Sequence, residues 1–285
     1  MYKRQNYTST VSTLSSSDAT FRQAGTFAVN HPVSVALGSQ QLRPEKSKHQ
    51  TVGVVYQPTS DFSVSFDYFT ADIDDRIMLT GNIIDTVSPQ VKAILKQYGV
   101  QSARYFTNAI GTETQGLDIR LNYKHSFKDH SKLKMVGSYH RDRTRITDVH
   151  PLASILGNQT AAAVLNDTTQ SFIETAQPAD GYKLWTQYEA GDWRTTLNLN
   201  RVGSYYYVNG SQFGAKLTTD LDLAWQLSKN LEVAVGANNI FNVLPDKFAT
   251  TSNLFVSGNG IIQYPPISPY GYNGAFFYVR LNLKL

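Results

Sequence analysis

The last twelve residues of the chain, from Gly274 to Leu285, alternate between apolar and other side chains. The apolar positions are Phe277, Val279, Leu281, Leu283 and Leu285, and the positions between them hold Tyr278, Arg280, Asn282 and Lys284. Because successive side chains of a β-strand point to opposite faces, this stretch predicts a strand with one wholly apolar face and one polar, cationic face. The apolar face needs an environment other than water.

The same alternation recurs along the chain and predicts about nine strands. They are expected at 51–57, 62–79, 104–127, 132–149, 182–189, 193–209, 217–227, 231–241 and 275–285. The connections at 58–61, 128–131, 190–192 and 228–230 are short, whereas those at 81–102, 150–177 and 248–273 are long. Short turns at one end and long loops at the other are typical of outer-membrane barrels. We therefore predict an all-β, antiparallel transmembrane β-barrel segment: about nine strands of a larger barrel, forming an open sheet when taken alone.

Two further segments have a recognisable local character. Residues 6–47 are rich in Ser, Thr, Asn and Gln and predict a long exposed loop. Residues 88–98, with Pro89 in the first turn, predict a short helix inside the long connection that follows the second strand.

Composition excludes several other classes of protein. The chain has 285 residues, of which 12% are aromatic and only 17% charged. A mean hydropathy of -0.31 and the lack of a long apolar run exclude a helical membrane protein. The net charge of +4 is too small, and the basic residues too scattered, to indicate a nucleic-acid partner. With no cysteine, the chain has neither disulfides nor thiolate metal ligands.

No catalytic constellation is present in the sequence. The six histidines are scattered and lack the helical i, i+4 spacing of a metalloprotease pair. There is no nucleophile elbow, P-loop or cysteine-based zinc motif. We therefore predict that the protein is not an enzyme, with no catalytic residues, no metal site and no cofactor.

Three groups of residues are candidates for contact with a membrane. The terminal-strand residues Phe277, Val279, Leu281, Leu283 and Leu285 would face lipid. Trp193 and the pair Tyr205 and Tyr207 lie roughly 28 Å apart along a tilted strand, which matches two aromatic girdles. Arg141, Arg143 and Arg145 either face outward, where they could pair with lipopolysaccharide phosphates, or face solvent or the interior; the sequence leaves both readings open.

The long connections are the candidates for ligand binding, because loops on a rigid scaffold carry most binding residues. The connection at 248–273 contains Phe255, Tyr264, Tyr270 and Tyr272, whose rings could grip a ligand by stacking. Packing of the loops on one another is the alternative for each of these residues.

Four segments together resemble the TonB-dependent receptors, the energised importers of Gram-negative outer membranes. Leu42-Arg-Pro-Glu-Lys-Ser47 is similar to the family's L-x-P-E-x-S stretch, and Ala71-Asp-Ile-Asp-Asp-Arg-Ile77 resembles the end of the strand after it. Phe106-Thr-Asn-Ala-Ile-Gly-Thr-Glu-Thr-Gln-Gly-Leu-Asp118 is similar to the family's N-A-x-x-x-x-T-x-G-x-D strand. Val235-Gly-Ala-Asn-Asn-Ile-Phe-Asn242 resembles its penultimate strand.

The resemblance implies an outer-membrane receptor that imports a scarce small-molecule nutrient, by default an iron–siderophore complex. Its implied partners are membrane lipid and lipopolysaccharide, the barrel-assembly machinery, and the TonB complex through an N-terminal part. The chain contains no signal peptide, TonB box or plug domain, so we expect residues 1–285 to be the C-terminal portion of a receptor barrel. It also ends in Leu285, where the family usually has an aromatic residue. A passive porin-like barrel and a soluble β-sandwich binding module are the alternatives.

Overall fold

The computed structural model describes residues 9–14, 21–152, 155–156, 165–207, 211–249 and 263–284. The chain divides into two compact units, which are described separately below. Unit 1 comprises Met1–His49, Ala71–Thr114 and Thr144–Glu174. Unit 2 comprises Gln50–Thr70, Gln115–Arg143 and Thr175–Leu285.

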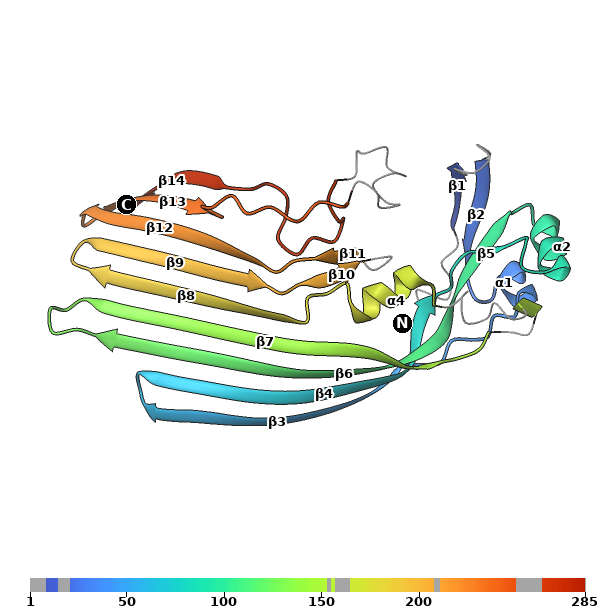
Figure 1. Cartoon of the computed structure of the whole chain (residues 1–285), viewed down its shortest axis with the longest axis horizontal. Helices are drawn as coiled ribbons and strands as arrows, with labels where there is room; N and C mark the ends of the chain where they lie inside the picture. Colours follow the sequence, from blue (N-terminus) through green and yellow to red (C-terminus); the bar gives the residue numbers. More distant parts are fainter. Residues whose placement is uncertain are drawn as a thin grey trace. The chain divides into compact units, whose positions relative to one another are not determined.

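Nine strands follow one another in chain order through a twelve-stranded sheet (Figure 1). They are β3 (Lys46–Thr59), β4 (Phe62–Leu79), β6 (Ser102–Ser126), β7 (Lys132–Val149), β8 (Asp180–Ala190), β9 (Trp193–Val202), β12 (Lys216–Ser228), β13 (Leu231–Asn238) and β14 (Phe276–Leu283). Every pair from β7 to β14 is antiparallel. Within the described residues β3 pairs only with β4 and β14 only with β13, so the sheet is open. The predicted fold class is confirmed.

Four short turns lie at the same end of unit 2, where the sequence predicts them (Figure 1). They occupy residues 60–61, 127–131, 191–192 and 229–230. Gly191 has a φ of +57°, which a residue without Cβ adopts at no steric cost. In the longest turn, Ser131 donates from its hydroxyl and its backbone N–H to Asp129, at 2.7 and 3.1 Å. These hydrogen bonds hold the pKa of Asp129 below its ordinary value.

Unit 1 contains regular structure beyond what the sequence predicts. The predicted loop at 6–47 is wrong, because this segment contains β1 (Ser9–Leu14), β2 (Phe21–Phe27) and α1 (Pro32–Ala36). The predicted helix at 88–98 is confirmed as α2 (Pro89–Gln97), which follows β5 (Ile83–Ile84) and is capped by the Ser88 side chain. The predicted loop at 150–177 contains α4 (Asp167–Glu174). No helix among the described residues is long and apolar enough to cross a membrane.

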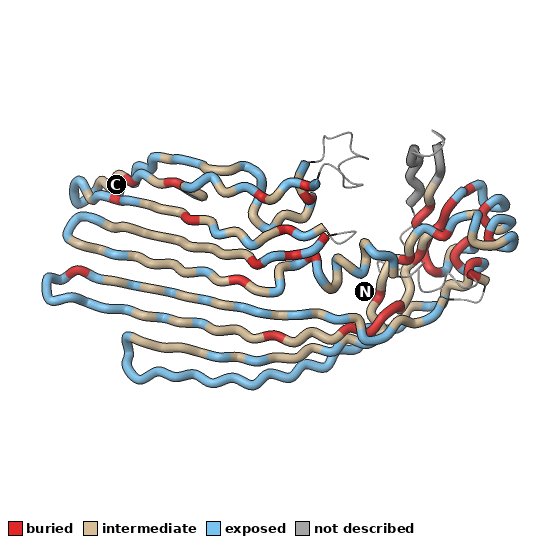
Figure 2. The backbone as a smooth tube through the Cα atoms, viewed as in Figure 1, coloured by how far each residue is buried: buried red, intermediate tan, exposed pale blue. Residues whose placement is uncertain are grey.

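A compact hydrophobic core explains why these segments of unit 1 are ordered (Figure 2). Its buried members are Phe27, Val33, Leu37, Ile83, Val91, Leu95, Val100, Ala103, Tyr105 and Leu156. They come from α1 and α2, from β2, β5 and β6, and from the connections between them. Burying a side chain of this size contributes about 1.5–3 kcal/mol, so a few of them offset the entropy of ordering a short loop.

Unit 2 is arranged differently, as a sheet with two chemically distinct faces. The four apolar residues Phe277, Val279, Leu281 and Leu283 of β14 are 65–71% exposed. Val235 lies opposite Val279, and Leu223 lies opposite Val235 in turn, so the apolar face continues across three strands.

Ion pairs and hydrogen bonds cover the other face of the same strands. The guanidinium of Arg280 lies 3.1 Å from a carboxylate oxygen of Asp222, and that of Arg194 lies 2.9 Å from Glu232. The side-chain amide of Asn282 also donates to Glu232, at 2.9 Å. The charged groups of β9, β12, β13 and β14 thus satisfy one another on the face away from the apolar side chains.

Two glycines of the family-like motifs make room for aromatic rings in unit 2. A Cβ on Gly236 would lie 2.3 Å from the ring of Tyr278, its partner across β13 and β14. The Tyr278 hydroxyl then reaches Asp222, to which it donates at 2.9 Å. A Cβ on Gly116 would lie 2.3 Å from the ring of Phe69. Each ring lies over the backbone of its glycine, in the space that a side chain at that position would fill.

The two faces of β14 should tolerate an added positive charge to different degrees. In the complete gene product, Val279→Arg should make folding into a bilayer less favourable by up to about 2–4 kcal/mol, because a cation would enter hydrocarbon. Asn282→Arg, the matched control on the ion-paired face, should cost far less. Urea titrations of folding into lipid vesicles measure both values, and equal costs would show that the face assignment is wrong.

The contact between Gly236 and Tyr278 predicts a strong coupling between the two positions. Gly236→Val should destabilise the protein by about 1–3 kcal/mol, because the new side chain overlaps the ring. In a Tyr278→Ala background the same substitution should cost much less. Denaturant unfolding of the four proteins of this cycle measures the coupling, and additive effects would contradict the proposed packing.

Candidate functional site

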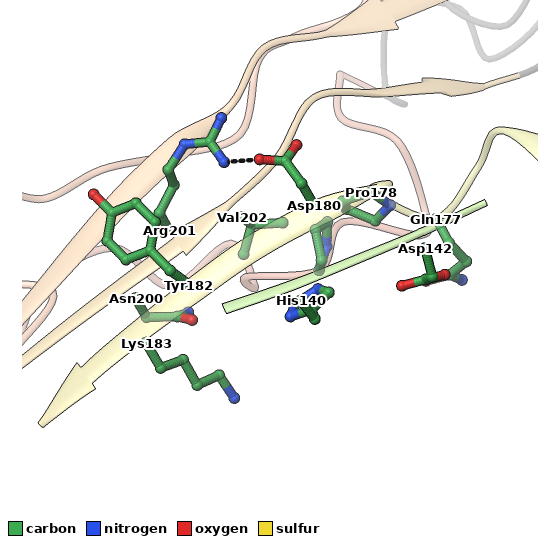
Figure 3. A pocket seen from close by; sticks show the side chains of 11 residues that line it. His140, Asp142, Gln177, Pro178, Asp180, Tyr182, Lys183, Asn200, Arg201 and Val202 are labelled. Atoms are coloured by element: carbon green, nitrogen blue, oxygen red, sulfur yellow. Dashed lines mark hydrogen bonds and ion pairs between the residues drawn. The ribbon is translucent and has the colours of Figure 1, made fainter. Parts of the chain in front are cut away.

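A cavity of about 410 Å³ opens in unit 2 beside the middle of β7, the first residues of β8 and the last residues of β9, on the side away from the short turns (Figure 3). It is lined by His140, Asp142, Gln177, Pro178, Asp180, Tyr182, Lys183, Asn200, Arg201, Val202 and Pro269. The strand register places His140, Gly181 and Val202 side by side across the three strands. A Cβ on Gly181 would lie 2.7 Å from the imidazole of His140, so the glycine leaves room for that ring.

Charged groups of both signs surround the cavity. Arg201 forms an ion pair with Asp180, and its guanidinium lies 5.9 Å from the centre of the Tyr182 ring. Lys183, His140 and Asp142 contribute further ionisable groups, and Figure 3 shows the Lys183 side chain leading away from the Asp180–Arg201 pair. By strand parity Asp180, Tyr182 and Arg201 share one face of the sheet, whereas His140, Lys183 and Asn200 share the other. The polar groups on each face can donate and accept hydrogen bonds.

An aromatic cluster lies in unit 2 beyond the end of β9. Its buried members are Ala176, Tyr205, Tyr207, Phe213 and Phe248. The Tyr205 and Phe213 rings stack with their centroids 5.1 Å apart, and the Phe213 and Phe248 rings meet edge to face at 5.4 Å.

The prediction that Tyr205 and Tyr207 form an exposed aromatic girdle is therefore corrected. Both residues are buried, Tyr205 to 1% exposure, and only Tyr206 between them is exposed. The cause is that β9 ends at Val202, and Gly203 donates back to the Asp180 carbonyl at 2.8 Å. The chain then forms β10 (Tyr205–Tyr207), which pairs with β11 (Ser211–Phe213) instead of continuing the long strand.

Trp193, the other predicted girdle residue, is 54% exposed beside the turn at 191–192. Its ring stacks on that of Trp225, its direct neighbour on β12, with centroids 5.4 Å apart. Trp225 is not among the residues predicted above. The two short turns at 190–192 and 228–230 would have revealed it, because each tryptophan lies within a few residues of one of them.

The predicted ligand-binding tyrosines lie on the connection before β14. Tyr264 and Tyr272 have ring centroids 5.6 Å apart, and the Lys247 ammonium lies 5.7 Å from the Tyr264 ring. The Tyr272 hydroxyl donates to the Pro265 carbonyl. The hydroxyls of Tyr270 and Tyr205 are buried and have no hydrogen-bond partner among the described residues. Phe255 and Leu285 lie outside the described residues.

Asp246 anchors the segment next to this cluster. Its carboxylate accepts hydrogen bonds from the Lys216 ammonium at 2.5 Å and from the Gly214 N–H at 2.7 Å. Burial raises the pKa of Asp246, but these two hydrogen bonds and the Lys216 charge outweigh burial and lower it overall. The carboxylate is therefore fixed in its charged form.

The three predicted lipopolysaccharide-contacting arginines are all exposed. Within unit 1, the Arg145 guanidinium lies 3.4 Å from the Glu113 carboxylate, which partly neutralises its charge. Arg141 and Arg143 alternate along β7 with the half-buried Asp142 and Thr144. Among the described residues, no group of three or more His, Asp or Glu side chains could hold a metal ion.

The open antiparallel sheet and its two faces have the form of one segment of a transmembrane β-barrel. The family model described as "TonB dependent receptor-like, beta-barrel" matches residues 4–240, so the chain belongs to the TonB-dependent receptor family. This is a family of transporters in the Gram-negative outer membrane. No curated protein sequence matches the chain.

Solved structures show the same fold at low sequence identity. The ferric-catecholate import receptor Fiu from E. coli K12 aligns with a TM-score of 0.52, at 15% identity over 85% of this chain and 28% of its own. The outer membrane transporter YddB from Escherichia coli aligns with a TM-score of 0.55, at 11% identity over 86% of this chain and 33% of its own. The pyoverdine receptor FpvA from Pseudomonas aeruginosa PAO1 aligns with a TM-score of 0.52, at 13% identity over 87% of this chain and 31% of its own. The chain thus spans about a third or less of the length of these proteins.

The buried phenols predict a response to alkali. Burial, and secondly the charge of Asp246, raise the pKa of Tyr270 to about 12, and burial likewise raises the pKa of Tyr205. The folded protein therefore holds a proton that the unfolded chain loses near pH 10, so the stability of this region falls between about pH 10 and 12. The difference in absorbance at 295 nm between wild type and Tyr270→Phe should titrate with a midpoint near 12. A midpoint near 10 would contradict the burial of this hydroxyl.

Proposed function

We propose that this chain forms the C-terminal part of the wall of an active outer-membrane receptor that imports a scarce small molecule, specifically an iron–siderophore complex. Membership of the receptor family supports active transport. The ferric-catecholate receptor and the pyoverdine receptor among the similar structures support the class of cargo. The whole receptor would take its energy from the TonB complex through a part outside this chain.

The loop-end cavity of unit 2 is the observation that best supports ligand capture by this part of the wall. Its volume of about 410 Å³ suits part of a siderophore-sized molecule. Arg201 is already committed to Asp180, whereas Lys183 offers an ammonium beside Asn200 and His140. A cargo with carboxylate or phenolate oxygens would find charge-assisted donors there. Aromatic residues of the nearby connection, including Tyr264 and Tyr272, would add stacking surface.

The exposed residues of β14 and β7 would contact the other proposed partners. Phe277, Val279, Leu281 and Leu283 would contact lipid, and β14 would be the strand that the barrel-assembly machinery binds. Arg141 and Arg143 are the better candidates for contact with lipopolysaccharide phosphates, because Arg145 is paired with Glu113.

Uptake by the complete gene product tests this function. Cells that lack their other iron receptors and express the complete gene should accumulate ⁵⁵Fe-labelled siderophore, and a protonophore should abolish the accumulation. Uptake that persists without the proton motive force, or ion conductance of the purified protein in planar bilayers, would indicate a passive pore instead.

Substitution in the cavity tests its part in ligand capture. Lys183→Glu should raise the ligand concentration for half-maximal uptake about tenfold or more, because a charge-assisted contact is worth about 1.5–3 kcal/mol. Lys134→Glu is the matched control, because Lys134 lies on β7 near the short turns and pairs with Glu189 at 3.8 Å. Equal effects of the two lysine variants would contradict a ligand role for the cavity.

Deletion of residues 254–270 should abolish uptake while the barrel remains resistant to heat on gels.

A further inference from the structure

The apolar face of unit 2 contains a groove where β6, β7 and β8 lie side by side (Figure 1). It has a volume of about 240 Å³, and one of its lining residues is Gly137, which lies opposite Leu184 in the register of β7 and β8. By strand parity, five half-buried side chains of this face line the groove: Ile119, Leu121, Tyr139, Tyr182 and Leu184. Aliphatic and aromatic carbon therefore forms its walls.

Gly137 differs from the two strand glycines that make room for rings. At Gly116 and Gly236 a Cβ would overlap an aromatic ring of the protein, whereas on Gly137 it would lie 3.7 Å from Leu121 and 3.9 Å from Leu184. The φ of Gly137 is negative, so neither the backbone nor a neighbouring side chain requires glycine there. A glycine inside a strand weakens the strand and often marks a place where another molecule approaches closely. The open space above Gly137 is therefore available to a molecule outside the chain.

Two exposed cations lie beyond the groove on the same face of β7. Arg141 and Arg143 continue the parity of Gly137 and Tyr139 toward the long loops. Four residues separate Gly137 from Arg141, which is about 13 Å along the strand and roughly 9 Å along the membrane normal at a tilt near 45°. The residue opposite Arg141 in register is Asp180, whose carboxylate is already paired with Arg201.

This arrangement matches the layout of an anionic lipid. The phosphate of such a lipid lies at the membrane surface, and its acyl chains run from there into the hydrocarbon. The long loops of an outer-membrane barrel are extracellular, so the leaflet at the height of Arg141 is the outer one, which consists of lipopolysaccharide.

We propose that the groove at Gly137 binds one acyl chain of lipopolysaccharide, while Arg141 and Arg143 bind a phosphate of the same molecule. The proposal rests on the outward orientation of the apolar face and on the lipopolysaccharide contact proposed above, and it is independent of the cargo. Within hydrocarbon there is no hydrophobic driving force, so the chain is held by van der Waals contact with the groove walls. The guanidinium groups add charge-assisted hydrogen bonds to the phosphate, which select an anionic lipid.

Binding of lipid A, the phosphorylated and acylated part of lipopolysaccharide, to the complete gene product in detergent tests the groove. Native mass spectrometry measures the apparent Kd. Gly137→Leu should weaken binding about fivefold or more, because the new side chain occupies the place of the acyl chain. Thr195→Leu is the matched control, because Thr195 lies on the same face of β9 near the short turn at 191–192. It adds similar bulk away from the groove and should leave the Kd unchanged.

The arginines are tested with the same measurement. The double substitution Arg141→Ala and Arg143→Ala should weaken binding of lipid A about tenfold or more. It should also remove the preference for lipid A over dephosphorylated lipid A. Lys134→Ala is the matched control, because Lys134 lies on the opposite face of β7, and it should have no effect. No siderophore is present, so a failure of this site and a failure of siderophore uptake are separate results.

Unchanged binding in Gly137→Leu, or an equal loss in Thr195→Leu, would overturn the acyl-chain site. Phosphatidylglycerol that binds as tightly as lipid A would overturn the assignment to lipopolysaccharide, because it would show a general site for anionic lipids. Should Gly137→Leu fail to fold, Gly137→Ala tests the same contact. Its single added carbon fits at ordinary contact distance and should weaken binding about twofold.

Discussion

The backbone hydrogen-bond ladder between neighbouring strands is the constraint on which this structure depends. In hydrocarbon an unpaired N–H or C=O costs several kcal/mol, so every strand that crosses a membrane needs partners on both sides. The ladder fixes the register, and the register decides which side chains share a face. In unit 2 it places Val279 beside Val235 on the apolar face, and Arg280 beside Ala234 on the other. The ion pair between Arg280 and Asp222 follows from that placement.

The sequence was sufficient to predict the long strands and their turns, because both depend on local patterns. Alternation needs only neighbouring residues, as in β14, and the turn at 191–192 needs only Gly191. The elements of unit 1 were missed because their stability comes from distant contacts. Residues of α1 such as Val33 are buried against partners from the connection that contains α2, and a Ser- and Thr-rich composition conceals such contacts. The cavity was missed for the same reason, since three strands and Pro269 build it.

The residues that carry the family resemblance have structural roles that their spacing alone does not reveal. Gly116 and Gly236 provide the space that the rings of Phe69 and Tyr278 fill. Asn108 binds the backbone of Arg43, and Glu45 binds that of Ile77. These positions explain how a sheet with little buried apolar volume keeps a defined register: single polar groups and rings replace the packing that a hydrophobic core supplies elsewhere. Tyr205 and Tyr207 show where alternation misleads. The alternating sequence pattern continues through them, but β9 already ends at Val202 and the two tyrosines belong to the short strand β10.

The central claim is that one face of the sheet in unit 2 contacts lipid and the other an aqueous interior. The sequence contains no cysteine, so a spin label attached to a single introduced cysteine is unambiguous. In the complete protein in lipid vesicles, labels at positions 276 to 283 of β14 should alternate in their accessibility to oxygen and to a water-soluble nickel complex. Labels that replace Val279 and Leu281 should collide with oxygen, and labels that replace Arg280 and Asn282 should collide with the nickel complex. Uniform accessibility along the strand, or the opposite alternation, would contradict it.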